Sequence, residues 1–257
     1  MCTVSWVRSA DGYELLCNRD EKRTRAKAIA PLIQCRDGVR FIAPADGDFG
    51  GSWICANEFG VSLCLLNGAG LRAAEVESRG LLLLVLASSR SVDEVCKRAS
   101  ATDLFRFAPF SVVTLEPHRP ALLIEWDGSE MATVLNGDPY MPLISSSFDT
   151  NTVQTRRRQE FERHLKAARN LDANLLHAFH ESHCQTPDAY SPCMHRTDAE
   201  TVSFSWVQVS AAEVGFFYSP ASPCAWHPGE RHTLPRYHAG MEFNDLTTIS
   251  DCLRHAS

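Results

Sequence analysis

The sequence has no long apolar run. Its most hydrophobic stretch, LLLLVLA at residues 81–87, is far shorter than the roughly 20 residues that a helix needs to cross a bilayer. The first residues also lack the basic region followed by an apolar stretch that marks a secretory signal. We therefore expect no membrane-spanning segment and a cytoplasmic location.

The sequence also has no surplus of basic residues. It contains 25 lysines and arginines against 31 aspartates and glutamates, which gives a formal net charge of −6. Nucleic-acid binding usually needs a basic face, and adsorption to a membrane surface needs a basic amphipathic segment. Both classes of partner are therefore disfavoured.

Phosphate-binding loops, repeats and linkers are absent too. The glycine-rich segment DGDFGGSW at 46–53 follows neither GxGxxG nor GxxxxGK, so it does not predict a phosphate cradle. The composition, 44% hydrophobic and 22% charged, is that of an average soluble globular protein. We expect one domain over residues 1–257.

The ten cysteines do not indicate a disulfide framework, which is typical of small secreted domains. Several lie inside apolar segments that resemble strands, such as ELLCN, SWICANE and SLCLLN. A buried free cysteine behaves as a small hydrophobic residue. We interpret these cysteines as core thiols.

Strand-like and helix-like segments follow one another in blocks. This order disfavours a doubly wound parallel sheet and predicts an α+β protein. Ser91, with Glu94 three residues later, predicts a capped helix start. The expected strands are 2–8, 13–18, 38–43, 52–57, 61–67, 110–116, 121–127, 130–135, 142–147, 199–209, 213–219 and about 231–238, the expected helical segments are about 78–100 and 150–182, and 19–36 is expected to be an irregular loop.

The first two strands predict a hairpin, because Asp11-Gly12 between them is a strong turn signal. The second strand then returns toward residue 2 and ends in the tetrad Asn18-Arg19-Asp20-Glu21. We therefore expect this tetrad to lie beside Cys2.

A cysteine at position 2 predicts a nucleophile if Met1 is removed. Its own α-amine, with a pKa near about 7.7–8.0, would then serve as the base. Arg19 would favour the thiolate and orient the substrate, and Asp20 would hold the α-ammonium or the Arg19 guanidinium. Asn67, at the end of the strand VSLCLLN, would donate to the oxyanion.

The N-terminal quarter of the chain resembles the NRDE family, which includes the Transport and Golgi organisation 2 proteins. The resemblance rests on Met1-Cys2, LLCNRDE (15–21), GGSW (50–53) and NEFGVSLCLLN (57–67). LISSS, before the basic helix, and HRTDAETVSF (195–204) match more weakly.

That family is similar in turn to N-terminal nucleophile hydrolases of the penicillin acylase and bile salt hydrolase type. The resemblance implies a four-layer αββα sandwich with an N-terminal cysteine nucleophile. Carried over to this sequence, it implies that Cys2, Arg19, Asp20, Asn67 and Arg196 are catalytic. It also implies substrate contacts at Asn18, Trp53 and Ser146, where serine replaces a second asparagine of those enzymes.

Two further motifs offer soft metal ligands. SPCMH (191–195) and SPCAWH (222–227) contain Cys193, His195, Cys224 and His227, which are zinc-ligand types. The C-x-H spacing is not a common zinc pattern, so we expect loop residues beside the core, with no metal and no cofactor. Nine of the ten histidines lie from residue 164 onward. Such histidines are more often surface or satisfied core residues, and it is the family resemblance that implies haem as an alternative ligand.

The segment TRRRQEFER (155–163) is open to two interpretations. It would bind an anion, such as a coenzyme A phosphate, if its arginines converged. We favour a solvated helix face paired with Glu160 and Glu162, because adjacent helical residues point in different directions.

The sequence therefore predicts an amidohydrolase that cleaves a non-peptide C–N bond of a small molecule. The alternative is a carrier or trafficking factor, for haem or acyl-coenzyme A, on the same fold. The serine at position 146 favours the carrier, and the set Cys2, Arg19, Asp20 and Asn67 favours the enzyme.

Overall fold

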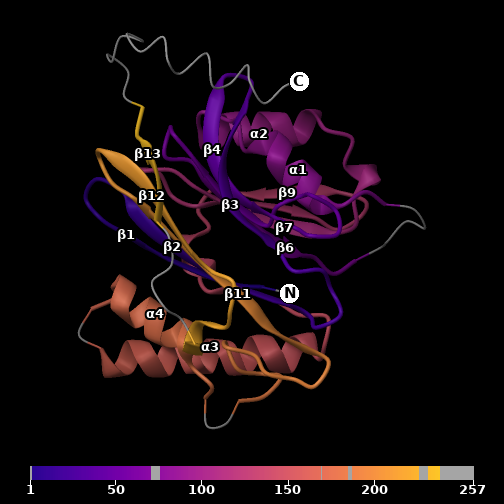
Figure 1. Cartoon of the computed structure of the whole chain (residues 1–257), viewed down its shortest axis with the longest axis vertical. Coiled ribbons are helices and arrows are strands. Elements are labelled where there is room, and N and C mark those ends of the chain that lie inside the picture. Colours follow the sequence, from indigo (N-terminus) through magenta and orange to yellow (C-terminus); the bar gives the residue numbers. More distant parts are fainter. Residues whose placement is uncertain (1, 71–75, 169, 185–186, 226–230, 238–257) are drawn as a thin grey trace.

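Two antiparallel sheets stack face to face in the computed structural model, which describes residues 2–70, 76–168, 170–184, 187–225 and 231–237 (Figure 1). The first sheet has the strand order β10-β1-β2-β11-β12-β13. Its strands are β1 (Cys2–Arg8), β2 (Tyr13–Lys22), β10 (Leu143–Ser145), β11 (Ala199–Val209), β12 (Glu213–Ser219) and β13 (Arg231–Pro235).

The second sheet runs in sequence order from β3 to β9. Its strands are β3 (Ile29–Arg36), β4 (Val39–Ala45), β5 (Ile54–Asn57), β6 (Ser62–Asn67), β7 (Phe110–Leu115), β8 (Leu122–Trp126) and β9 (Met131–Val134). The helices are α1 (Arg79–Leu86), α2 (Val92–Ala101), α3 (Thr150–Ala167) and α4 (Ala173–Glu181), with short 3₁₀ turns at Leu104–Arg106, Asp138–Tyr140 and Pro223–Ala225.

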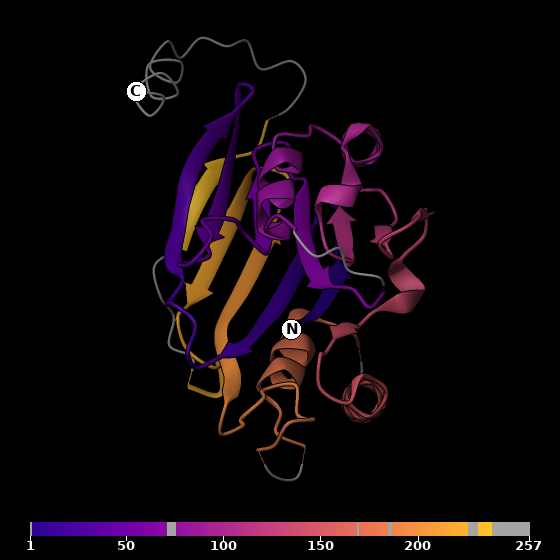
Figure 2. The same ribbon diagram turned by 90° about the vertical axis from the view of Figure 1, so that its right-hand side faces the viewer.

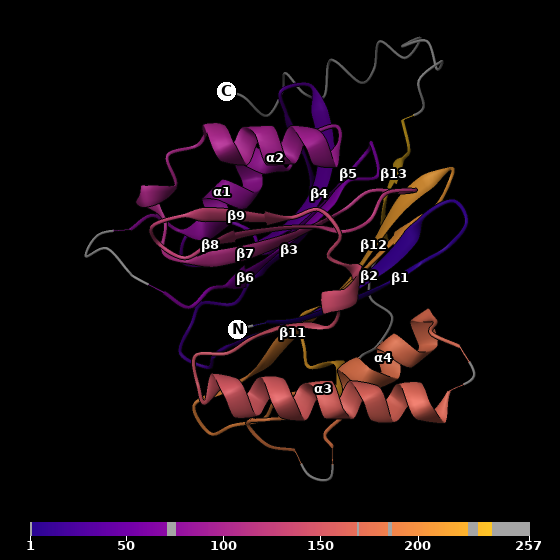
Figure 3. The same cartoon turned by 180° about the vertical axis from the view of Figure 1, so that it is seen from behind.

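Helices cover the outer face of each sheet, α1 and α2 on the second and α3 and α4 on the first (Figures 2 and 3). The central core lies between the sheets and includes Val4, Ile54 and Phe216. A second core, with Leu83 and Val95, lies under α1 and α2, and a third, with Phe179, lies under α3 and α4. The predicted α+β class and αββα sandwich are confirmed.

Local sequence signals explain the first hairpin and the start of α2. The turn after β1 is closed by the Ser9 N–H, which donates to the Gly12 carbonyl at 3.0 Å. The Ser91 hydroxyl accepts from the Glu94 N–H at 3.2 Å, and the Glu94 carboxylate accepts from the Arg90 N–H at 2.8 Å. Both predictions are confirmed.

One prediction is wrong. Residues 19–36 are not an irregular loop, because β2 continues to Lys22 and 29–36 form the edge strand β3. An edge strand that buries little of its surface carries a weak hydrophobic pattern. The helical segment predicted at 150–182 is confirmed and contains two helices, the second of which begins where the Asp172 carboxylate accepts from the Leu175 N–H at 2.8 Å.

The last expected strand is shorter than predicted: β13 ends at Pro235, and residue 238 lies outside the described residues. Within the described ranges, no helix combines the length and apolar character that a membrane crossing requires.

Candidate active site

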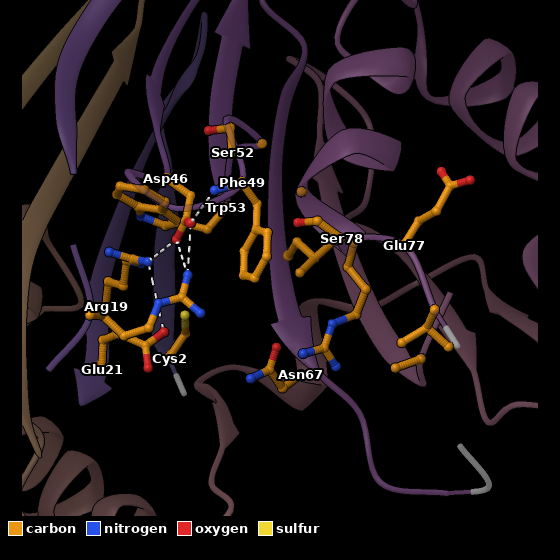
Figure 4. A pocket seen from close by; sticks show the side chains of 17 residues that line it. Cys2, Arg19, Glu21, Asp46, Phe49, Ser52, Trp53, Asn67, Glu77 and Ser78 are labelled. Carbon is orange, nitrogen blue, oxygen red and sulfur yellow. Dashed lines mark hydrogen bonds and ion pairs between the residues drawn. The ribbon is translucent and has the colours of Figure 1, made fainter. Parts of the chain in front are cut away.

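A pocket of about 420 Å³ lies at one end of the sandwich, where both sheets and the start of α1 meet (Figure 4). The first sheet contributes Cys2 and Arg19, and the second contributes Asn67. Figure 4 shows Cys2, Arg19 and Trp53 on one side, Glu77 and Ser78 on the other, and Asn67 between them. The full lining is Cys2, Arg19, Glu21, Arg25, Asp46, Phe49, Gly51, Ser52, Trp53, Leu65, Asn67, Val76, Glu77, Ser78, Arg79, Gly80 and Ala108.

Cys2 begins β1 and is held from both sides. It is directly opposite Arg19 of β2 and Ser145 of β10 in the antiparallel register. Residues opposite each other in such a pair project to the same face of the sheet, so Cys2 and Arg19 share the pocket. The Cys2 N–H donates to the Ser145 hydroxyl at 3.0 Å.

The surroundings of Cys2 favour the protonated form of its thiol. A hydrogen bond with the Cys17 thiol and burial together raise its pKa well above the usual value. Cys17 in turn lies 3.5 Å, sulfur to sulfur, from Cys64. The thiolate is the nucleophilic form, so Cys2 needs a nearby base before it can attack a carbonyl.

Arg19 is fixed by Asp46 rather than by Asp20. Its guanidinium forms an ion pair with the Asp46 carboxylate and lies 4.3 Å from the centre of the Trp53 ring. Arg25 donates to both oxygens of Asp46 at 2.7 Å. Because its position is constrained on these sides, Arg19 can orient an anionic or carbonyl group near Cys2.

Sequence reasoning missed Asp46. This residue follows β4, and its Oδ1 accepts the N–H groups of Asp48 and Phe49 at 3.1 Å, which folds the DGDFGG segment into a tight turn. An aspartate that starts a glycine-rich segment signals such a turn. Its partnership with Arg19 is long-range and leaves no local trace.

Asp20 and Asn18 project to the opposite face of the sheet, toward α3 and α4, because side chains alternate along a strand. The Asp20 carboxylate accepts from Arg157 of α3 at 2.9 Å and from the Thr201 hydroxyl at 2.6 Å. The Asn18 amide donates to the carbonyls of His180 and Pro192, both at 2.9 Å. Neither residue is part of the pocket lining.

Arg157 corrects the prediction of a solvated basic helix face. It is 1% exposed and also donates to the Thr3 hydroxyl at 2.5 Å. Arg156 and Arg158 beside it are exposed, and Arg163 forms the expected pair with Glu160 at 2.5 Å. That pairing lowers the pKa of Glu160 to about 2. The middle arginine therefore belongs to the interior.

The remaining predicted residues divide into two groups. Asn67 and Trp53 line the pocket, and the Trp53 indole N–H is buried without a hydrogen-bond partner among the described residues. Ser146 lies in the turn before α3 and donates to the Phe148 carbonyl at 2.6 Å. The serine that contacts the Cys2 nitrogen is its neighbour Ser145. Arg196 pairs with Asp198 at 2.8 Å and lies outside the pocket lining.

The start of α1 approaches the pocket through two glycines. A Cβ on Gly51 would lie 2.5 Å from the Gly80 carbonyl carbon, so the GGSW segment packs directly on the first turn of the helix. Ser78, the residue before α1, does not cap the helix with its side chain. Ser78, Arg79 and Gly80 line the pocket, so the start of α1, which carries a partial positive charge, lies at the pocket wall.

The sequence matches the family model described as Transport and Golgi organisation 2 over residues 1–214. No curated protein matches the sequence.

Several solved structures share the fold at low sequence identity. A cysteine-to-alanine mutant of the conjugated bile acid hydrolase from Clostridium perfringens matches with a TM-score of 0.55 and 11% identity, covering 91% of this chain and 92% of its own. The Caenorhabditis elegans ortholog of N-acylethanolamine-hydrolyzing acid amidase gives 0.51 and 16%, with coverage of 80% and 92%. Penicillin V acylase from Agrobacterium tumefaciens gives 0.55 and 8%, with coverage of 91% and 86%.

Proposed function

The chain belongs to the Transport and Golgi organisation 2 family, and on this premise we propose that it is an amidohydrolase with Cys2 as its nucleophile. It would cleave a non-peptide C–N bond of a small molecule. One observation carries the proposal: Cys2 is opposite Arg19 in the first hairpin, at a pocket that Asn67 also lines.

The names of the structural neighbours support this reaction class. They describe a bile acid conjugate hydrolase, an N-acylethanolamine amidase and a penicillin acylase. Each of these names refers to a small molecule. A pocket of about 420 Å³ is in the size range that holds such a ligand.

Removal of Met1 would activate the thiol. The raised pKa of Cys2 keeps it protonated while no base is near. A freed α-amine on the same residue supplies that base. The Ser145 hydroxyl, which already contacts the Cys2 nitrogen at 3.0 Å, would orient the amine.

In the first half-reaction, the sulfur of Cys2 bonds to the substrate carbonyl carbon and the thiol proton passes to the α-amine. The Asn67 amide and a backbone N–H donate to the oxyanion. The α-ammonium then gives its proton to the leaving nitrogen as the C–N bond breaks. Water adds to the resulting thioester with the amine as base, and the carbon–sulfur bond breaks to release the acid and restore the thiol.

The direct test is the intact mass of the purified protein before and after treatment with a β-lactam probe. We expect the loss of one methionine and the addition of one probe per chain. Peptide mapping should place the label on Cys2. The exposed thiol of Cys184 serves as the internal control, because an activated nucleophile reacts with the probe faster than an ordinary exposed thiol does.

Retention of Met1, or labelling of the exposed cysteines alone, would contradict the activated-nucleophile mechanism. The protein would then have to use the pocket without covalent chemistry.

Asn67→Ala is expected to lower kcat by about 10²–10³-fold, the usual cost of losing one oxyanion donor. Asn67 is exposed at the end of β6, so the variant should keep its unfolding midpoint. Steady-state kinetics on the best substrate of an amide screen would measure the effect. Asn151→Ala, an exposed asparagine on α3, is the matched control, and equal kcat values for the two variants would remove Asn67 from the mechanism.

A second candidate function is a carrier of an anionic ligand such as haem or acyl-coenzyme A. The observation that favours it is the presence of Arg19, Arg25 and Arg79 in the pocket lining, because arginine binds carboxylate and phosphate groups well. Saturable binding of haemin by protein that retains Met1, without hydrolysis of any amide, would favour the carrier over the enzyme.

A further inference from the structure

Four side chains with metal-binding atoms converge outside the pocket. They are His183, Cys193, His195 and Cys224, and their ligand atoms all lie within 4.8 Å of one another. Two are imidazoles and two are thiols, which is the ligand set of many structural zinc sites. Cys193 is buried, and the other three are partly or fully accessible.

The separations fit one ion at the centre. His195 Nε2 lies 3.2 Å from His183 Nε2, 3.4 Å from Cys193 Sγ and 3.5 Å from Cys224 Sγ. A tetrahedral zinc ion with ordinary bond lengths separates two nitrogen ligands by about 3.3 Å and a nitrogen from a sulfur by about 3.6 Å. The three separations from His195 Nε2 therefore match those of a zinc tetrahedron, and the remaining ligand atoms lie within 4.8 Å of one another.

We propose that His183, Cys193, His195 and Cys224 bind one zinc ion in a structural site. The four protein ligands complete the tetrahedron, so no coordination position is open for a substrate.

The ion would join two distant parts of the chain. His183, Cys193 and His195 belong to the connection between α4 and β11, and Cys224 lies in the 3₁₀ turn Pro223–Ala225 after β12. Because the four ligands come together only in the folded chain, the free energy of zinc binding would add to the free energy of folding. The zinc ion would therefore hold the connection between α4 and β11 against the first sheet.

The connection between α4 and β11 also contacts β2 on the face opposite the pocket. The Met194 N–H donates to the Thr201 hydroxyl at 2.8 Å, and that hydroxyl donates to Asp20. The Asn18 amide donates to the Pro192 carbonyl. Zinc would thus stabilise the strand that carries Arg19, from the face opposite the pocket.

Sequence spacing pointed to a different fourth ligand. The two SPC motifs suggested His227, which lies outside the described residues. The structure brings His183 to the cluster instead, ten residues before Cys193 and in no recognisable motif with it. The unusual C-x-H spacing predicts ordinary loop residues rather than a metal site. In the folded chain, His183 adds a fourth metal-binding side chain that this spacing does not include.

The test is the zinc content of the full-length protein, produced in zinc-supplemented medium and dialysed without chelator. Elemental mass spectrometry should give close to one zinc per chain. Cobalt added to the stripped protein should give the absorption of a tetrahedral thiolate site. Cys193→Ser, Cys224→Ser and His183→Ala should each lower the bound zinc at least about fivefold.

Cys96→Ser is the matched control, because Cys96 is a partly buried thiol on α2, in the opposite helix layer. Cys224 is exposed, so its variant should fold even if Cys193→Ser does not. Absence of zinc from the unaltered protein would overturn the site. Loss of zinc in His227→Ala but not in His183→Ala would overturn the ligand set. Zinc content needs no assay of hydrolysis, so it is independent of the proposed function.

Discussion

Replacement of Cys2 by alanine is expected to lower kcat/KM for amide hydrolysis by roughly 10⁴-fold or more, the scale seen when a catalytic nucleophile is removed. The residual site still has Arg19 and Asn67 in its lining, so it would bind substrate without forming a thioester. Steady-state kinetics with the processed protein would measure the loss. The fold should remain intact, because Cys2→Ala removes only one sulfur atom at the start of β1.

Cys55→Ala is the matched control for this experiment. Cys55 is a fully buried thiol under α1 and α2, so its variant reports the cost of losing a core thiol without touching the pocket. Unchanged turnover in Cys2→Ala would exclude the mechanism. If neither the unaltered protein nor Cys2→Ala hydrolyses an amide and both bind haem or acyl-coenzyme A, the carrier function would stand instead.

Asp20→Asn is expected to lower the free energy of unfolding by about 3–5 kcal/mol, because it leaves a buried charge without its partner. Arg157 and Asp20 are each 1% exposed and joined at 2.9 Å. The Thr201 hydroxyl would keep an oxygen acceptor in the variant, but the guanidinium would lose its countercharge. Urea denaturation followed by circular dichroism would measure the change.

Two further variants test the prediction for Asp20→Asn. Asp198→Asn breaks the partly exposed pair with Arg196 and should cost under about 1 kcal/mol, as surface pairs do. The double variant Asp20→Asn/Arg157→Met should recover part of the loss, since it removes the stranded charge. Equal effects of Asp20→Asn and Asp198→Asn would show that burial of the pair contributes nothing.

The part of the site that the sequence predicts is the part built from neighbouring strands. An Asp-Gly turn fixes the first hairpin, and strand pairing then determines that Cys2 is opposite Arg19. Asn67 was found in the same way, from its place at the end of an apolar strand that reaches the pocket.

The other part depends on contacts between distant segments. Asp46, Arg157 and His183 carry no local signal of their partners, because those partners are 27, 137 and 12 residues away. The three adjacent arginines at 156–158 of α3 look alike in sequence, and only the packing of the helix decides which one is buried. Asp20 is a separate case, because the alternation of side chains along β2 is a local rule and by itself places Asp20 on the opposite face from Arg19.

The alternation of side chains along β2 divides the tetrad Asn18-Arg19-Asp20-Glu21 into two pairs with different contacts. Arg19 and Glu21 line the pocket, whereas Asn18 and Asp20 tie β2 to the helix layer behind it. In a cell, unstable chains are degraded, so a loss of folding free energy reduces how much protein accumulates. Missense changes at Asn18 or Asp20 would therefore reduce the amount of protein that accumulates, while changes at Glu21, which is only partly buried, would alter the pocket with less effect on that amount.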